Sequence, residues 1–115
     1  MFACDQYRDP STYFAFVVGN VAYPPPLRPT TKCVQDAEDM RDLLLTSGYP
    51  RDNVITALNK RHDELLSCLT KFKQRVDGAE GCCVVLFYAG HGMEGLGGEV
   101  ILMPIDADVP SSRSK

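Results

Sequence analysis

The sequence lacks any hydrophobic run long enough to cross a membrane and any excess of one charge. Its longest apolar runs, residues 13–18 and 82–89, are far shorter than the roughly 20 residues of a membrane-spanning helix. It holds 12 lysines and arginines against 15 aspartates and glutamates, a net charge of −3, with both signs interspersed. This balance excludes the strongly basic surface that binds nucleic acids and anionic membranes. We therefore predict a globular protein with no nucleic-acid partner and no membrane partner.

A secretory signal and zinc-binding cysteine spacings are also missing. Residues 1–10 are polar and charged, whereas a signal peptide has an apolar centre. The five cysteines are an odd number, and Cys82 and Cys83 are neighbours, whose side chains would point to opposite faces of a strand. Free thiols in a reducing compartment are the simplest interpretation. We therefore predict a cytoplasmic protein with no metal site and no cofactor.

What the sequence does contain is an alternation of strand-like and helix-like segments within 115 residues, enough for one small domain. Residues 13–18 are continuously apolar, as in a strand covered on both faces, and the four prolines between residues 23 and 29 predict an extended loop. Thr30 or Thr31 would cap the helix that follows. The other predicted elements are a helix over 33–47, a strand over 53–58, a helix over 61–76, a strand over 82–88, a glycine-rich turn over 90–98 and a strand over 99–103.

This order predicts a mostly parallel sheet with helices on both faces, a three-layer α/β/α fold. We place the domain at residues 13–110, after a flexible leader over 1–12 and before a polar tail over 111–115. Functional groups of such folds lie at the carboxyl ends of the strands. Two loops meet this condition, residues 19–31 and 89–98.

His91 carries the strongest chemical signal in these loops. It directly follows a hydrophobic strand and stands between Gly90 and Gly92. Glycine on each side permits tight backbone geometry and leaves the imidazole and nearby N–H groups accessible. Histidine also exchanges protons near neutral pH, which suits general acid–base catalysis. An incidental histidine in a surface turn is the alternative, but the position at the end of a strand favours function.

Four segments in chain order carry a family resemblance: residues 17–20 (VVGN), 33–37 (CVQDA), 85–92 (VLFYAGHG) and 103–107 (MPIDA). Together they resemble the N-terminal, large-subunit part of the caspase, metacaspase and paracaspase family of cysteine peptidases. The entry to the first helix is more similar to that of metacaspases and paracaspases than to that of animal caspases. The resemblance implies a caspase-like fold, cysteine-type endopeptidase activity and a protein or peptide substrate.

The resemblance also implies roles for single residues. His91 matches the histidine of the Cys-His dyad, which activates or orients the cysteine thiolate and protonates the leaving amine. Gly92 matches the glycine whose N–H contributes to the oxyanion hole. Asp36 matches an acid that lines the pocket for a substrate Arg or Lys, although a carboxylate there serves the helix dipole equally well. Calcium dependence is a further property of such relatives, and the sequence identifies no ligands for it.

The chain departs from the family pattern at the nucleophile. The family's cysteine ends the next parallel strand, which no segment of the 115 residues matches. Cys82 and Cys83 precede His91 on one strand by well over about 20 Å at about 3.3 Å per residue, so we interpret them as core thiols. Cys33 opens the first helix, where the helix dipole favours a thiolate, and is the weaker, alternative nucleophile. We therefore expect a partial peptidase domain without turnover of its own.

The strand over 82–88 would then expose an unpaired edge, which invites a partner chain or self-association. A catalytically inactive caspase-like module for protein interaction is the alternative function. A third interpretation, an unrelated α/β domain that binds an anion at its glycine-rich loop, is less well supported, because that loop leads into a strand and not into a helix.

Overall fold

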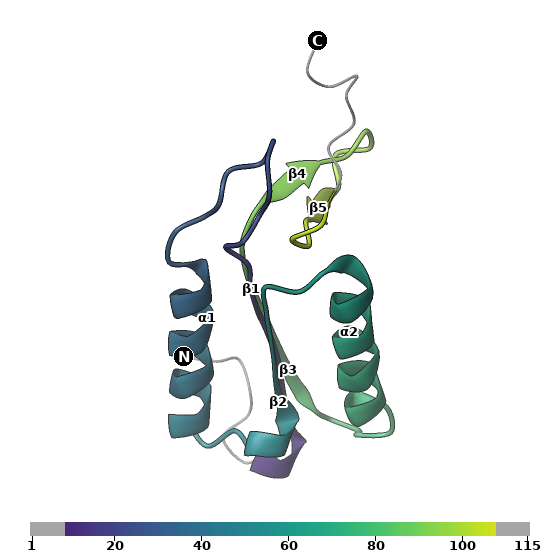
Figure 1. Ribbon diagram of the computed structural model, residues 1–115. Helices are drawn as coiled ribbons and strands as arrows, with labels where there is room; N and C mark the ends of the chain where they lie inside the picture. The colour runs from purple at the N-terminus through teal and green to yellow at the C-terminus, as the bar shows by residue number, and fades with distance from the viewer. Residues whose placement is uncertain (1–8, 108–115) are drawn as a thin grey trace.

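Three parallel strands form the centre of the structure, a computed structural model that describes residues 9–107. The middle strand is β1 (Tyr13–Gly19), with β2 (Val54–Leu58) on one side and β3 (Cys83–Ala89) on the other. One helix, α1 (Cys33–Thr46), covers one face of this sheet, and α2 (His62–Val76) covers the opposite face (Figure 1). The predicted three-layer α/β/α fold with a mostly parallel sheet is confirmed.

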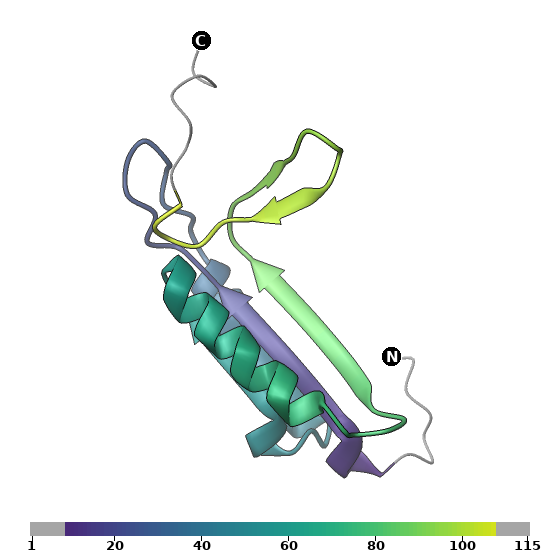
Figure 2. The same ribbon diagram turned by 90° about the vertical axis from the view of Figure 1, so that its right-hand side faces the viewer.

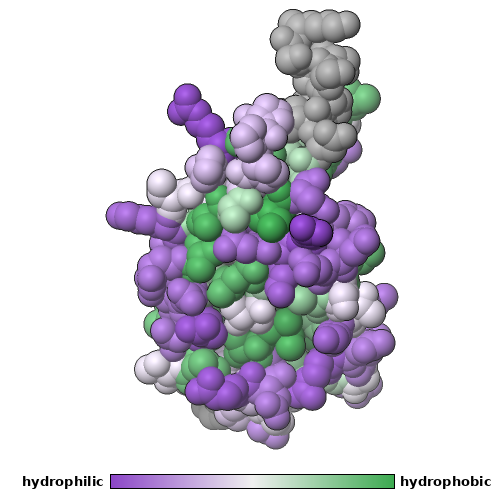
Figure 3. All heavy atoms as spheres, in the orientation of Figure 1, coloured by the Kyte–Doolittle hydropathy of each residue, from purple (hydrophilic) through white to green (hydrophobic). Residues whose placement is uncertain are grey.

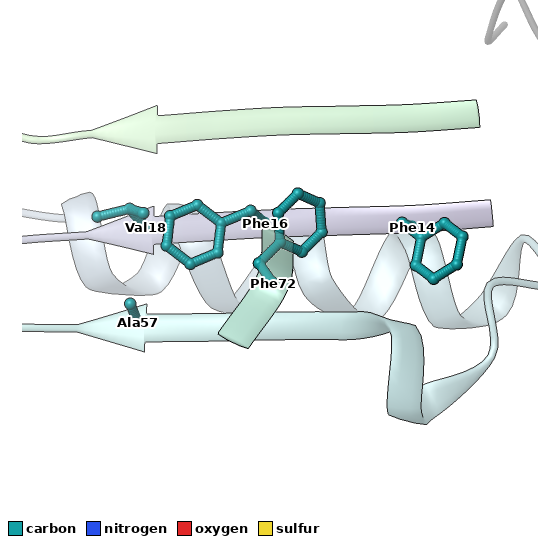
Figure 4. Close-up of a cluster of buried hydrophobic side chains, with 5 residues drawn as sticks. All are labelled: Phe14, Phe16, Val18, Ala57 and Phe72. Atoms are coloured by element: carbon teal, nitrogen blue, oxygen red, sulfur yellow. The ribbon is translucent and has the colours of Figure 1, made fainter. Parts of the chain in front are cut away.

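The continuous apolar run of β1 reflects its central place, because successive side chains of a strand point to opposite faces. Phe14, Phe16 and Val18 pack toward α2 with Ala57 and Phe72, as Figure 4 shows. The rings of Phe16 and Phe72 lie 5.4 Å apart. On the opposite face, the intervening residues pack against α1 in a second cluster made of Ala15, Val17, Ala37, Leu44 and Tyr49. Both faces of β1 are therefore core.

The sheet is more exposed at β3 than at β1. In the order β2-β1-β3, the outer edge of β3 has no strand partner among residues 9–107. Figure 2 shows α2 lying over β1 and β2, with β3 beside it. Val84 and Leu86 are accordingly 41% and 70% exposed. Seen from the opposite edge, that of β2, apolar surface lies in the strip between the two helices and polar surface covers the helices (Figure 3).

Gly19 permits close packing between the end of β1 and the start of α1. A Cβ atom at Gly19 would lie 2.7 Å from both the Cβ of Ala37 and the carbonyl oxygen of Cys33. The predicted threonine cap of this helix is wrong. The helix is preceded by Lys32 in the left-handed conformation (φ 51°) without a side-chain cap, while the hydroxyl of Thr30 donates to the carbonyl oxygen of Asn20 (2.6 Å).

A small hairpin stands at the carboxyl end of the sheet (Figure 2). It pairs β4 (Gly92–Glu94) with β5 (Val100–Leu102) in antiparallel fashion. The first of these strands falls within the predicted glycine-rich turn, so the turn itself is shorter than expected. After β5 the chain returns to the start of α2, where the Asp106 carboxylate accepts a hydrogen bond from the backbone N–H of His62 (2.7 Å).

Two short 3-10 helices complete the described chain, at Pro10–Thr12 and Arg51–Asn53. The rest of the predicted leader, residues 1–8, and the predicted tail over 111–115 lie outside the described residues. Within residues 9–107, no helix has both the length and the apolar character that a membrane crossing needs.

Candidate active site

The ends of β1 and β3 bring the two predicted functional loops together. The backbone N–H of Asn20, directly after β1, donates to the carbonyl oxygen of Ala89, the last residue of β3 (2.9 Å). The carboxyl ends of parallel strands meet at one edge of a sheet, so the loop over residues 20–32 lies against the Gly90-His91 segment. His91 lies where the sequence predicts it.

The imidazole of His91 rests on the proline-rich loop. Its Nε2 lies 2.6 Å from the carbonyl oxygen of Arg28, and its ring lies 4.5 Å from the ring of Tyr23 at an angle of 59°. A carbonyl oxygen only accepts hydrogen bonds, so Nε2 must carry the proton. In the neutral imidazole, Nδ1 is then the nitrogen that accepts a proton.

Two tyrosine hydroxyls hold the main chain of His91. The Tyr23 hydroxyl accepts the His91 N–H (2.9 Å) and donates to the carbonyl oxygen of Met103 (2.8 Å). The Tyr88 hydroxyl lies 2.6 Å from the carbonyl oxygen of His91 and donates to it. It also accepts the N–H of Met103 (3.3 Å), which itself donates to the His91 carbonyl (3.1 Å). Each hydroxyl thus supplies one donor and one acceptor to this part-buried junction.

This junction is partly shielded from water. Tyr23 is 2% exposed and Asn20 is fully buried, and the Asn20 side-chain amide approaches the Met103 carbonyl at 3.4 Å. Burial, with the neighbouring Tyr23 hydroxyl as a second cause, raises the pKa of Tyr88 far above its ordinary value. Tyr88 therefore stays protonated and remains a donor at neutral pH.

These two hydroxyls leave no room for a side chain at Gly90. A Cβ atom at Gly90 would lie 2.7 Å from the hydroxyl oxygens of both Tyr23 and Tyr88, a distance that real Cβ contacts do not show. The sequence singles out this glycine next to His91 but does not predict either tyrosine as part of the site. The available signal was a tyrosine two residues before the Gly-His pair, at the end of an otherwise apolar strand.

Gly92 presents its backbone N–H on the outside of the hairpin. The hydrogen bond from Met103 to the carbonyl of His91 makes these two residues a hydrogen-bonded pair. Such pairs alternate with non-hydrogen-bonded ones along an antiparallel ladder, and the next pair is Gly92 with Leu102. The Gly92 N–H therefore points away from β5. A Cβ atom at Gly92 would lie 3.5 Å from the nearest atom, the carbonyl oxygen of Ile101, an ordinary contact.

Asp36 and Cys33 lie in the first turn of α1, at the same end of the sheet as His91. The Asp36 side chain is exposed, and the Cys33 thiol is free and half-buried. The side-chain hydrogen bonds of His91 run to the loop before α1 and not to either residue. The fold places both residues at the same end of the sheet as His91. The substrate-binding role of Asp36 and the nucleophile role of Cys33 stay predictions.

The other described cysteines lie away from this site. Cys68 and Cys82 pack at the margin of the phenylalanine cluster under α2, in agreement with the core role predicted for Cys82. Cys33, Cys68 and Cys82 are free, as predicted, but Cys83 is disulfide-bonded, so the expectation of free thiols is wrong for that residue. The cytoplasmic location that rested on this expectation stays a prediction. Residues 9–107 contain no cluster of three or more side chains suited to hold a metal ion.

A parallel sheet between two helices, with a glycine-flanked histidine at the carboxyl end of β3, defines a caspase-like α/β domain. A family model for the caspase domain of peptidase family C14 matches residues 12–113, most of the chain. The chain therefore belongs to the caspase-domain family. No individual curated protein matches it.

Proposed function

We propose that this domain supplies the general acid–base and an oxyanion donor to a cysteine-type endopeptidase. The observation that carries the proposal is the hydrogen bond between His91 Nε2 and the Arg28 carbonyl (2.6 Å). It leaves Nδ1 as the nitrogen that exchanges protons with a thiol and a leaving group. The Gly92 N–H, directed away from β5, is the proposed oxyanion donor.

The proposed reaction needs a cysteine thiolate beside His91. The thiolate attacks the scissile carbonyl, a carbon–sulfur bond forms, and the Gly92 N–H stabilises the resulting oxyanion. The intermediate collapses as the imidazolium protonates the leaving amine, and the carbon–nitrogen bond breaks. Water, deprotonated by His91, then hydrolyses the thioester. Among the free thiols of residues 9–107, only that of Cys33 lies at the same end of the sheet as His91. We propose that the nucleophile belongs to a segment outside the described residues that pairs with the outer edge of β3.

Asp36 is the proposed source of specificity for Arg or Lys before the scissile bond. Its carboxylate is exposed in the first turn of α1, at the active-site end of the sheet, and is available to a cationic side chain. The alternative role of this carboxylate, in the first turn of a helix, is interaction with the helix dipole. A change in substrate selectivity, rather than in stability, separates the two roles.

Peptidase assays on the full-length protein, with fluorogenic peptides that end in Arg, Lys or Asp, test the proposal. His91→Ala should reduce kcat by roughly 10²–10⁴-fold, the usual contribution of a general acid–base. The matched control is His62→Ala, because the His62 side chain is exposed and its ring pairs with the exposed Asp63. Cys33→Ser should leave activity intact. Activity that survives His91→Ala would remove this residue from the mechanism, and loss through Cys33→Ser would make Cys33 the nucleophile.

A second function, an inactive interaction module, is supported by the apolar surface beside β3. A groove of about 550 Å³ runs between α2 and β3, and its mostly apolar lining includes Leu66, Leu69, Leu86 and Leu102. It adjoins the outer edge of β3, a seven-residue strand without a charge or a proline. Such an edge accepts a further strand readily. Binding of a partner chain that persists in His91→Ala, without peptidase activity in the wild type, would favour this function.

A further inference from the structure

Tyr23 engages His91 on two sides at once. Its hydroxyl accepts the backbone N–H of His91 (2.9 Å), and its ring packs against the imidazole with centroids 4.5 Å apart. Tyr23 belongs to the same loop as Arg28, whose carbonyl oxygen binds His91 Nε2 (2.6 Å). One loop therefore packs against the His91 ring, binds its main chain and supplies the partner of Nε2. Tyr23 is a buried residue of this loop.

Tyr88 completes the support from the sheet. Its hydroxyl donates to the carbonyl oxygen of His91 (2.6 Å) and accepts the N–H of Met103 (3.3 Å). Both backbone polar groups of His91 thus have side-chain partners, one from the loop after β1 and one from β3. Because each hydroxyl has a single proton, Tyr23 directs its own to Met103 (2.8 Å) and Tyr88 directs its own to His91. With these assignments, two further close contacts receive no proton. They are the contact of the Tyr88 hydroxyl with the Met103 carbonyl (3.0 Å) and the contact between the two hydroxyls (3.1 Å).

We propose that Tyr23 and Tyr88 are positioning residues that fix the main chain of His91 and so hold its imidazole in the Nε2–H form against the Arg28 carbonyl. This inference rests on the proposed function, in which Nδ1 of His91 exchanges protons. It assigns a role to two residues that act through the main chain of His91.

The physical reason is the short reach of the Arg28 hydrogen bond. A hydrogen bond of this type is lost when its two heavy atoms separate beyond about 3.5 Å. A main-chain shift at His91 of about 1 Å would therefore release Nε2 and allow either nitrogen to carry the proton. The tyrosine hydroxyls oppose that shift, because one binds the N–H and the other binds the C=O of His91.

Nitrogen-15 NMR of the full chain tests the inference without any need for turnover. In the wild type we expect one dominant set of His91 ring signals, with the protonated nitrogen at Nε2, and slow exchange of the His91 amide proton. Tyr23→Phe keeps the ring contact and removes the hydroxyl. It should accelerate exchange of the His91 amide at least tenfold and give averaged ring signals of both tautomers. Tyr88→Phe should also shift the tautomer signals, with a smaller effect on the amide.

Tyr49→Phe is the matched control, since Tyr49 is equally buried (4% exposed) but packs on the α1 side of the sheet. It should leave the His91 signals unchanged even if it changes the stability. Unchanged His91 signals in a folded Tyr23→Phe protein would overturn the proposal. If Tyr23→Phe does not fold, the wild-type spectrum decides: mixed tautomers or rapid amide exchange at His91 would contradict it. Failure of the peptidase proposal would leave all these signals as predicted, so the two failures are distinguishable.

Discussion

Replacement of Gly90 by alanine should destabilise the domain through the two tyrosine hydroxyls, although the added group is a single methyl. The new Cβ would lie 2.7 Å from the hydroxyl oxygens of Tyr23 and Tyr88 and 3.0 Å from Cζ of Tyr88. An ordinary contact needs about 3.4 Å or more, so both hydroxyls must move by about 0.7 Å. Both are bound to the main chain of His91, and the Tyr23 hydroxyl is also bound to the Met103 carbonyl.

The expected magnitude follows from these bonds. A hydrogen bond in a folded protein contributes about 0.5–1.5 kcal/mol, and a buried group left without a partner costs about 1–3 kcal/mol. Loss or weakening of three such bonds predicts a decrease of about 2–4 kcal/mol in the free energy of unfolding. With a urea m-value of about 1.5 kcal/mol/M, the midpoint should fall by about 1.3–2.7 M.

Urea unfolding followed by circular dichroism measures this change, and Gly92→Ala is the control on the other side of His91. Its Cβ would meet no atom closer than 3.5 Å, so the midpoint should stay within about 0.3 M of the wild type. In a protein that already carries Tyr23→Phe and Tyr88→Phe, the effect of Gly90→Ala should be smaller, because the two oxygens are gone. An equal effect in both backgrounds, or an equal effect of Gly92→Ala, would refute the reasoning.

Three further expectations concern Tyr88, Asp36 and Leu86. The pKa of Tyr88 is raised by burial from its ordinary value of 10.0, so its stabilising contribution is complete below about pH 10 and is lost as the pH rises toward the folded-state value. Urea unfolding from pH 8 to 11 should show stability falling above pH 10 by up to about 1.4 kcal/mol per unit, and an equally steep fall in Tyr88→Phe would contradict this origin. Asp36→Ala should lower kcat/KM of the full-length protein for Arg-ending peptides by about tenfold or more relative to Asp-ending ones. Asp39→Ala, which changes another exposed side chain of α1, should not alter this ratio. Equal selectivity in both variants would remove Asp36 from the pocket. Leu86→Lys places a charge beside the outer edge of β3, at a side chain that is 70% exposed. Sedimentation velocity should therefore show weaker self-association, with unchanged thermal stability. Oligomers that persist in this variant would exclude this surface as the site of self-association.

The sequence predicted the structure best where the hydrophobic pattern of a segment and the order of the segments both indicate its place in the sheet. The apolar run of β1 predicted a strand with both faces covered, because only the central strand of a parallel sheet is buried on both sides. The place of His91 followed from the same reasoning, since a residue directly after such a strand lies at the functional edge. The predicted helices, over 33–47 and 61–76, agree with α1 and α2 to within about one residue at each end.

The misjudged elements depend on contacts between distant parts of the chain. Thr30 is a good helix cap by residue type, but its hydroxyl binds the carbonyl of Asn20 instead. Gly92–Glu94 lies among glycines that favour a turn, yet it forms the strand β4 because β5 pairs with it. Local propensity does not reveal either outcome, because the competing partner is supplied by the tertiary fold.

The sequence by itself therefore determined the α/β class, the strand and helix order and the position of the glycine-flanked His91. Each of these follows from a periodic pattern or from residues adjacent in the chain. Only the tertiary structure decided how His91 is held, because the folded strands and loop bring to it Tyr23, Tyr88 and Met103, which are 68, 3 and 12 residues away along the chain. It also decided why Gly90 has no side chain, since the atoms that exclude a Cβ belong to those same tyrosines.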